Sequence, residues 1–176
     1  LLEAKNNVNI EGTFIISQVL WTADRDNPNG DSFESWGASW GSYPTERAEI
    51  ANYIYDNRIK NVAFICADVH MQAIDDGRNS CYITDINGDR VDPNTIEKDF
   101  WTPVLEASPF DQYVSYEGGP FNTTDLEGSG GPTNSSENSY GVVEVLDIGE
   151  NWLQVKMYTM ALIGGVWTRN RFYTFN

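Results

Sequence analysis

One feature most constrains the fold of this 176-residue chain: a segment with helical spacing (45–57) is followed by a continuous apolar segment (61–70). Between Thr45 and Asn57 the apolar residues recur at helical spacing, and Pro44 suits the first turn of such a helix. The stretch "NVAFICADVH" (61–70) then predicts a strand that is covered on both faces, as in α/β sheets. Together with a β-branched strand predicted at 13–20, these elements indicate a βαβ unit with parallel strands.

The rest of the chain predicts further strands and two long loops in a single domain, residues 1–176. The loops, at about 21–43 and 110–139, are rich in Gly, Pro, Asn and Ser. The dipeptide Asn87-Gly88 predicts a hairpin with a type I′ turn. Strands are predicted at 100–108, 140–148, 151–161 and 165–176, and the last three form an antiparallel meander.

Composition excludes two classes of partner. With 11 Lys and Arg against 26 Asp and Glu, the net charge of -15 repels nucleic acid and anionic lipid. No apolar run is long enough to span a bilayer. The low lysine content and the sequons at Asn122 and Asn134 favour a secreted, glycosylated protein. No signal peptide is visible, and the start at Leu1, without methionine, suggests a processed product or a fragment.

Asp68 and His70, the latter the only histidine, lie at the carboxyl end of the predicted strand. Open α/β sheets bind their ligands at this edge. A carboxylate oxygen and an imidazole nitrogen that aim at one point would suit a metal ion. The alternative is a capping aspartate beside an exposed or hydrogen-bonded histidine, and the spacing by itself leaves both interpretations open.

The surrounding segments place this pair in a longer order of motifs. Trp40, Gly41 and Tyr43 precede a helix that starts with Glu46-Arg47, and an apolar strand from Asn61 to Cys66 leads to Asp68-Val69-His70. This order resembles the alkaline phosphatase D (PhoD-like) family of metal-dependent phosphomonoesterases and phosphodiesterases. "PVLEASPF", "GGPFN" and the closing "YGVVEV" to "FYTF" are also similar to segments of that family.

The resemblance covers residues 1–176 as the C-terminal half of a family member. It implies an α/β fold in which a layered mixed β-sheet sandwich is flanked by helices, the calcineurin-like metallophosphoesterase fold. Ala67 stands where the family has glycine, a change that removes no ligand. The family's other metal ligands come from its N-terminal half. That half, in the same protein or in another chain, is therefore the expected partner.

The activity implied by the resemblance is hydrolysis of phosphate mono- or diesters once the N-terminal half is present. Asp68 and His70 would be the catalytic and metal-binding residues of a two-metal centre of divalent or trivalent ions, which are calcium and iron in some members. Trp40 and Tyr43, with Trp36, would line the substrate cleft, although packing of their loop on the sheet explains them equally well. The alternative function is a catalytically inactive extracellular structural or assembly protein that keeps the phosphatase-like fold.

Two clusters of Asp and Asn residues contain side-chain oxygens that could bind calcium, but hydrogen-bonded polar turns are the expected explanation for both clusters. Their members are Asp24, Asp26, Asn29 and Asp31 in one cluster, and Asp85, Asn87, Asp89 and Asp92 in the other. With the tryptophans, these clusters support a third interpretation, a small sugar- or calcium-binding module.

The remaining expectations concern cysteines, arginines and one edge of the sheet. Cys66 is expected to be a packed thiol, although pairing with Cys81 stays open. Arg169 and Arg171 share a face by the two-residue period and are expected to be surface charges. An unpaired sheet edge and apolar surface near residues 13–20 predict that the chain is not a stable monomer.

Overall fold

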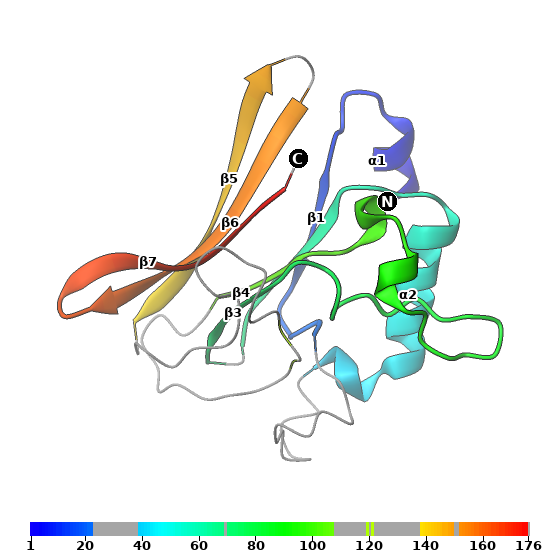
Figure 1. The fold of residues 1–176 in the computed structure, drawn as a ribbon, viewed down its shortest axis with the longest axis horizontal. Coiled ribbons are helices and arrows are strands. Elements are labelled where there is room, and N and C mark those ends of the chain that lie inside the picture. Colours follow the sequence, from blue (N-terminus) through cyan, green and yellow to red (C-terminus); the bar gives the residue numbers. More distant parts are fainter. Residues whose placement is uncertain are drawn as a thin grey trace.

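The protein has two β-sheets and a helical layer in a computed structural model that describes residues 1–22, 39–68, 70–107, 119, 121, 138–149 and 152–175. A four-stranded sheet in the order β1-β2-β4-β3 faces a three-stranded sheet in the order β5-β6-β7. The helices α1 (Leu2–Asn6) and α2 (Pro44–Asp56) lie on the other side of the four-stranded sheet (Figure 1). The sequence therefore folds into three layers, helix on sheet on sheet.

The four-stranded sheet is mixed. It contains β1 (Thr13–Ser17), β2 (Val62–Cys66), β3 (Gln72–Asp75) and β4 (Val104–Ala107). β1, β2 and β4 run parallel, and β3 is antiparallel to β4. The βαβ unit predicted from the sequence is confirmed as β1, α2 and β2, whereas β3 is a strand that the sequence pattern did not predict.

The predicted antiparallel meander is confirmed as β5 (Ser139–Gly149), β6 (Trp152–Ile163) and β7 (Val166–Phe175). Between Thr159 and Met160 the register shifts, so that these neighbours pair with Arg171 and Arg169. The shift interrupts the two-residue period between the two arginines. Because the side chain of Arg171 lies outside the described residues, their common face stays a prediction. The guanidinium carbon of Arg169 lies 4.3 Å from the centroid of the Tyr158 ring.

Hydrophobic clusters on both faces of the four-stranded sheet hold the layers together, because successive residues of a strand point to opposite faces. Phe64 and Val104 belong to the cluster between the four-stranded sheet and the helical side, where the Trp21 ring stacks on Phe64 with 4.0 Å between centroids. Ala63 and Leu105, their neighbours in sequence, belong to the cluster between the two sheets. The continuous apolar composition of β2 follows from this coverage on both faces.

The predicted hairpin at Asn87-Gly88 is present only as a short turn. Its strands are reduced to one antiparallel bridge between Thr84 and Arg90. Gly88 has a φ of 84°, but Asn87 is absent from the described non-glycine residues with positive φ, so the predicted type I′ turn is wrong. The Asp85 carboxylate accepts the N–H of Asn87 at 2.8 Å, and this side-chain bond shapes the turn instead.

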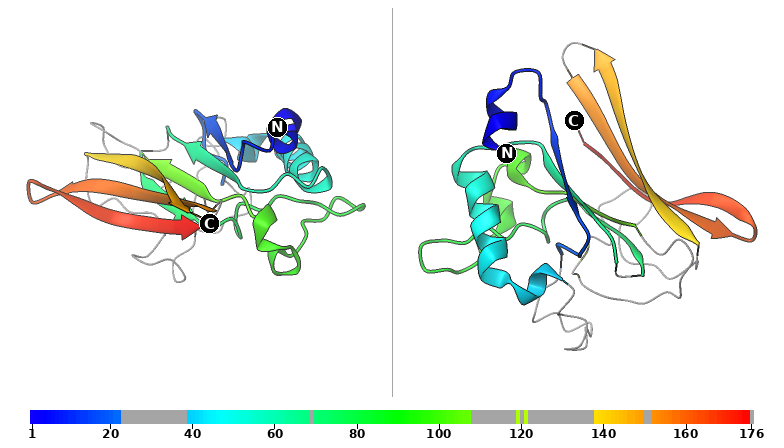
Figure 2. Two further views of the ribbon diagram at one scale, coloured as in Figure 1. Left: turned by 90° about the horizontal axis from the view of Figure 1, so that it is seen from above. Right: turned by 180° about the vertical axis from the view of Figure 1, so that it is seen from behind.

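The fold class is mixed α/β, with one mixed sheet and one antiparallel sheet. The expected flanking helices are found on one side only, where the described part of the chain has two α-helices (Figure 2). Three short 3-10 helices add to them, at Trp40–Ser42, Pro93–Thr95 and Lys98–Phe100. Among the described residues, no helix has the length and apolar character needed to cross a membrane. Most of the two predicted long loops lies outside these residues.

Candidate functional site

Both candidate residues, Asp68 and His70, lie in the connection between β2 and β3. Because β4 separates β2 from β3 in the sheet, this connection passes across the carboxyl end of β4. The carboxyl end of β1 lies at the same edge, since β1, β2 and β4 are parallel. The pair therefore lies at the sheet edge that the sequence predicted for it, where open α/β sheets bind ligands.

The backbone is left-handed at both residues. The φ angle is 84° at Asp68 and 50° at His70, a region that residues other than glycine seldom occupy. Each such residue costs of the order of 1–3 kcal/mol, and such residues concentrate at active sites and ligand clamps. Of the four described non-glycine residues with positive φ, two belong to this one connection. The left-handed residues change the direction of the backbone directly after β2.

The pair supplies two metal-binding atom types but not a complete site. Asp68 is exposed, and His70 is half-buried. A carboxylate and an imidazole suit iron and zinc, and the carboxylate also suits calcium. In the described ranges, no three His, Cys, Asp or Glu side chains form a group that could hold a metal ion. The carboxylate of Asp68 and the imidazole of His70 are therefore suitable metal ligands by their chemical type. Two ligands do not complete a metal site, so further ligands are needed.

A buried carboxylate near this edge was not singled out from the sequence. Glu106 is fully buried on β4, one residue before the strand ends, and pairs in register with Cys66. Burial, and then the charge of Glu106, raise the pKa of the Cys66 thiol. A lone glutamate within the apolar strand "VLEA" was the available signal, because buried glutamates are rare.

The aromatic cleft candidates lie close to the same edge. The indole N–H of Trp40 donates to the hydroxyl of Ser17, the last residue of β1, at 3.1 Å. Trp40 also packs edge-on against Trp21, with 5.4 Å between ring centroids. Tyr43 is 56% exposed directly before α2. Trp40 thus has a clear packing role, whereas Tyr43 is free to meet a ligand, and Trp36 lies outside the described residues.

The two cysteines are buried free thiols rather than a disulfide. Burial is the main cause that raises the pKa of both Cys66 and Cys81. The packed thiol predicted for Cys66 is confirmed.

Of the two polar clusters that could bind calcium, the structure describes the one from Asp85 to Asp92. Asp85 accepts backbone N–H groups in its turn, which lower the pKa of its carboxyl, and Asp92 caps a 3-10 helix through the N–H of Asn94. These contacts confirm the polar-turn interpretation for that cluster. The cluster from Asp24 to Asp31 and both sequons lie outside the described residues.

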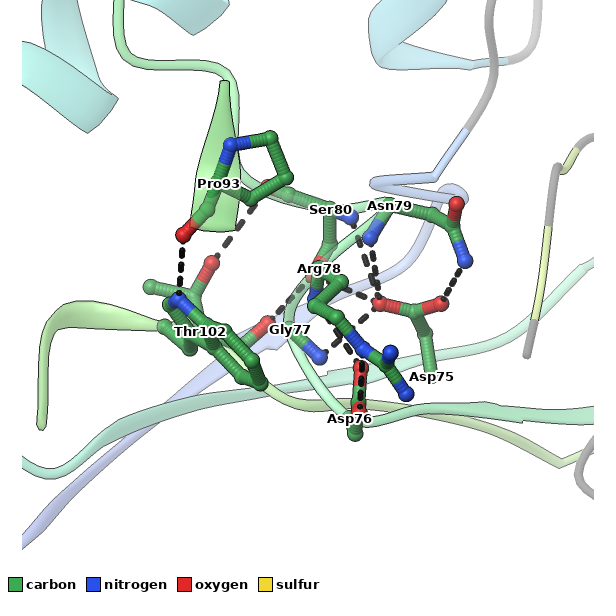
Figure 3. A network of polar contacts seen from close by, with 9 residues as sticks. Asp75, Asp76, Gly77, Arg78, Asn79, Ser80, Pro93 and Thr102 are labelled. Atoms are coloured by element: carbon green, nitrogen blue, oxygen red, sulfur yellow. Dashed lines mark hydrogen bonds and ion pairs between the residues drawn. The ribbon is translucent and has the colours of Figure 1, made fainter. Parts of the chain in front are cut away.

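A network of hydrogen bonds surrounds Asp75, the last residue of β3, which lies beside the amino end of β4 (Figure 3). Its carboxylate accepts hydrogen bonds from four N–H groups, the backbone N–H groups of Gly77, Asn79 and Ser80 and the side-chain amide of Asn79, at distances of 2.7 to 3.2 Å. The Ser80 hydroxyl also donates to the carbonyl of Thr102 at 2.6 Å. Asp75 therefore fixes the turn after β3, and it does not contribute to the Asp68 and His70 pair.

A groove of about 780 Å³ also lies away from the pair. It opens between the start of β1 and the second sheet, where Phe14, Val145 and Phe175 are among its lining residues. Because Gly12 and Thr13 line it as well, the groove is at the amino end of β1, opposite the edge that carries Asp68.

The sequence model of the family described as PhoD-like phosphatase matches residues 9–147. This range contains β1 to β4, α2 and the connection with Asp68 and His70, and it ends within β5. No curated protein and no solved structure matched the chain. The family resemblance of the motif order is confirmed for this range, while β6 and β7 lie beyond it.

Proposed function

Since the chain belongs to the PhoD-like phosphatase family, we propose that it acts in the metal-dependent hydrolysis of phosphate mono- or diesters. In this role the chain would form the C-terminal half of such an enzyme, with the calcineurin-like fold. Its main support is the strained connection that carries Asp68 and His70 at the carboxyl edge of three parallel strands. The N-terminal half would provide the other ligands.

Asp68 and His70 would act as metal ligands. The exposed carboxylate of Asp68 would bind one ion, and the imidazole of His70 would bind a second ion or the phosphoryl group. The bound ions would polarise the phosphoryl oxygens and lower the pKa of the attacking water. The left-handed backbone would hold the two side chains in place before substrate arrives, which reduces the reorganisation needed on binding.

The charge of the chain requires metal ions or a local cluster of arginines to offset it where a phosphate ester binds. A net charge of -15 repels a phosphate ester at long range. Bound cations are often the largest local charges in a site, and they can reverse this field where the ester binds. Tyr43, exposed at the start of α2, is the candidate for contact with the organic part of the ester. We also propose a secreted location, in keeping with the few lysines and two sequons.

The test uses the full chain together with the separately produced N-terminal half of a PhoD-like phosphatase. The mixture is supplied with calcium and iron, and p-nitrophenyl phosphate and bis-p-nitrophenyl phosphate are the substrates. We expect activity with about two metal ions per complex by elemental analysis. His70→Ala and Asp68→Asn should each lower kcat/KM by about 100-fold or more and reduce the metal content.

The matched control is Asp85→Asn, which removes the same charge from an exposed turn remote from the sheet edge. This variant should keep its activity and metal content. A folded complex without stoichiometric metal and without hydrolysis of either ester would overturn the proposal. That result would favour the alternative, a structural or assembly protein with a phosphatase-like fold.

A further inference from the structure

The groove at the amino end of β1 has an apolar wall that the second sheet forms. Val145 of β5 pairs with Val155 of β6, and Val155 pairs in turn with Phe175 of β7. These three residues form a continuous apolar row across the sheet, because directly paired residues share a face. Phe14 of β1 packs against the same buried cluster as Val155 and Phe175, and Val145 is 48% exposed. The apolar row is thus in part open to a ligand.

A second set of lining residues is basic. Lys5 lies on α1, and Arg58 and Lys60 lie between α2 and β2. This basic cluster holds three of the eleven Lys and Arg residues of the chain, whereas only two of the lining residues, Glu11 and Asp99, are acidic. In a chain of net charge -15, the groove therefore has a local excess of one positive charge. Such a local excess attracts a single negative charge at short range.

Two residues of the basic cluster already bind carboxylates of the chain. The guanidinium of Arg58 lies 3.0 Å from the carboxylate of Glu97, and the ammonium of Lys60 lies 2.7 Å from that of Asp99. The four side chains are 45% to 60% exposed. Ion pairs with this exposure contribute only about 0–1 kcal/mol each, so they can rearrange at little cost. The two cations are therefore suited to accept a carboxylate from outside the chain.

The backbone beside the basic cluster is fixed in a strained conformation. Arg58 and Asn61 have φ angles of 54° and 56°, and they are the other two described non-glycine residues with positive φ. Arg58 stands directly after the C-cap of α2, where glycine is usual. The side-chain amide of Asn61 donates to the carbonyl of Glu11, and its own carbonyl accepts the N–H of Thr13, each at 2.9 Å. Strained residues concentrate at ligand clamps, and these bonds hold the wall of the groove in place.

We propose that the groove binds a free aliphatic carboxylate, such as a fatty acid. The tail would lie on the apolar row, and the carboxylate would pair with the basic cluster. The volume of about 780 Å³ lies within the range of about 300–1,000 Å³ that is usual for small-molecule sites. One excess positive charge matches a singly charged head. Because the groove lies at the edge opposite Asp68 and His70, this inference does not depend on the hydrolytic function.

The direct test is calorimetric titration of the wild-type chain with dodecanoate and with dodecyltrimethylammonium, both as monomers in solution. The two probes share an alkyl tail and carry opposite charges. The net charge of -15 favours the cation at long range, so only the local basic cluster can favour the anion. Dodecanoate should bind at least about tenfold more tightly. Equal or reversed affinities would overturn the proposal, as would no binding of dodecanoate at about 1 mM. Tighter binding of dodecyl phosphate than of dodecanoate would overturn the carboxylate head.

A pair of lysine variants tests the basic cluster. Lys60→Met keeps an apolar stem of similar length, removes the cation and leaves Asp99 unpaired in the groove, so dodecanoate should bind about fivefold or more weakly. The matched control is Lys156→Met. Lys156 follows Val155 on β6 and so points to the outer face of the second sheet, away from the groove. This control should change the affinity less than about twofold. Equal weakening by both variants would contradict the proposal.

Two further variants separate binding from stability. Lys5 donates to the carbonyl of Asn57, the C-cap of α2, and basic residues at a helix C-terminus stabilise the helix. Lys5→Met should therefore weaken dodecanoate binding as well as lower the free energy of unfolding in urea. A loss of stability with unchanged affinity would assign Lys5 to the helix alone and contradict its role in the site. Val145→Thr places a hydroxyl on the apolar row and should weaken binding about threefold. Unchanged affinity of this variant would overturn the placement of the tail.

Discussion

The two outer strands of the four-stranded sheet, β1 and β3, differ in how far they are covered. Every residue of β3 is at most 1% exposed, whereas Ile16 of β1 is 81% exposed. β7 lies close to β3, and burial together with the charges of Asp76 and Asp75 raises the pKa of Tyr173 to about 12. Among the described residues, β3 is thus covered by the second sheet, whereas the outer edge of β1 has no strand beside it.

The largest effect should come from the polar network that fixes the covered edge. Asp75→Ala leaves three N–H groups, those of Gly77, Asn79 and Ser80, without their acceptor. Unsatisfied buried donors are costly, so the free energy of unfolding should fall by about 3–5 kcal/mol in urea denaturation. Asp75→Asn keeps an acceptor of the same shape and should cost clearly less. Equal losses for the two variants would contradict this role of the carboxylate.

The same carboxylate should make stability depend on pH. Burial is the main cause that raises the pKa of Asp75, the charge of Asp76 adds to it, and the bond from Asn79 opposes it. The folded state therefore binds this proton more tightly than the unfolded state. Its contribution to stability is present below the ordinary aspartate pKa of 3.8 and is lost as the pH rises through the raised value.

Asp75→Asn isolates that contribution. Relative to this variant, the wild type should lose stability as the pH rises above the ordinary aspartate pKa of 3.8 and through the raised pKa of Asp75. The measurement is the free energy of unfolding of both proteins at several pH values. A constant difference between them would contradict the raised pKa.

An identical substitution on the two edge strands tests the difference in coverage. Ile74 on β3 is fully buried between the two sheets, so Ile74→Ala should cost about 2–4 kcal/mol. Ile16→Ala on β1 removes an exposed side chain and should cost less than about 1 kcal/mol. Chemical denaturation of the isolated chain measures both. Similar losses would show that the edge of β1 is covered in solution.

Glycine-to-alanine substitutions on the covered and uncovered sides should also differ in their effect on stability, by less than the isoleucine substitutions do. A Cβ on Gly141 of β5 would lie 2.4 Å from Cβ of Ala107 and 3.1 Å from Cδ2 of Leu105, so Gly141→Ala should destabilise by about 1–3 kcal/mol. At Gly12, next to β1, the nearest atom to such a Cβ is 3.4 Å away. Gly12→Ala should be neutral or slightly stabilising, by up to about 1 kcal/mol. Thermal unfolding of both variants would compare the two sites.

The smallest effect concerns the thiols. Cys66 and Cys81 are buried, and burial raises their pKa, so neither should react with a thiol reagent such as dithionitrobenzoate while the chain is folded. Both should react in guanidinium chloride. Rapid reaction of one thiol under native conditions would show that the cluster between sheet and helical side opens locally.

The sequence determined the elements whose signal is local. The period of residues 45–57 predicted α2, the apolar run after it predicted β2, and alternating segments at the end predicted β5, β6 and β7. The position of Asp68 and His70 after β2 followed from the same reasoning, because a ligand edge is defined by where a parallel strand ends. These predictions succeeded because propensity and hydrophobic pattern act over a few residues.

Only the tertiary structure decided the features that depend on distant segments. The four residues of β3 are too short and too uniformly buried to show a strand period, and pairing with β4 defines them. The left-handed backbone at Asp68 belongs to the connection that crosses over β4, and no local pattern encodes that crossing. The open edge of β1 was expected from the sequence, but its outward backbone N–H and carbonyl groups, at Phe14 and Ile16, could be assigned only from the pairing with β2. Pairing partners are chosen by long-range packing, and a single sequence records that choice only indirectly.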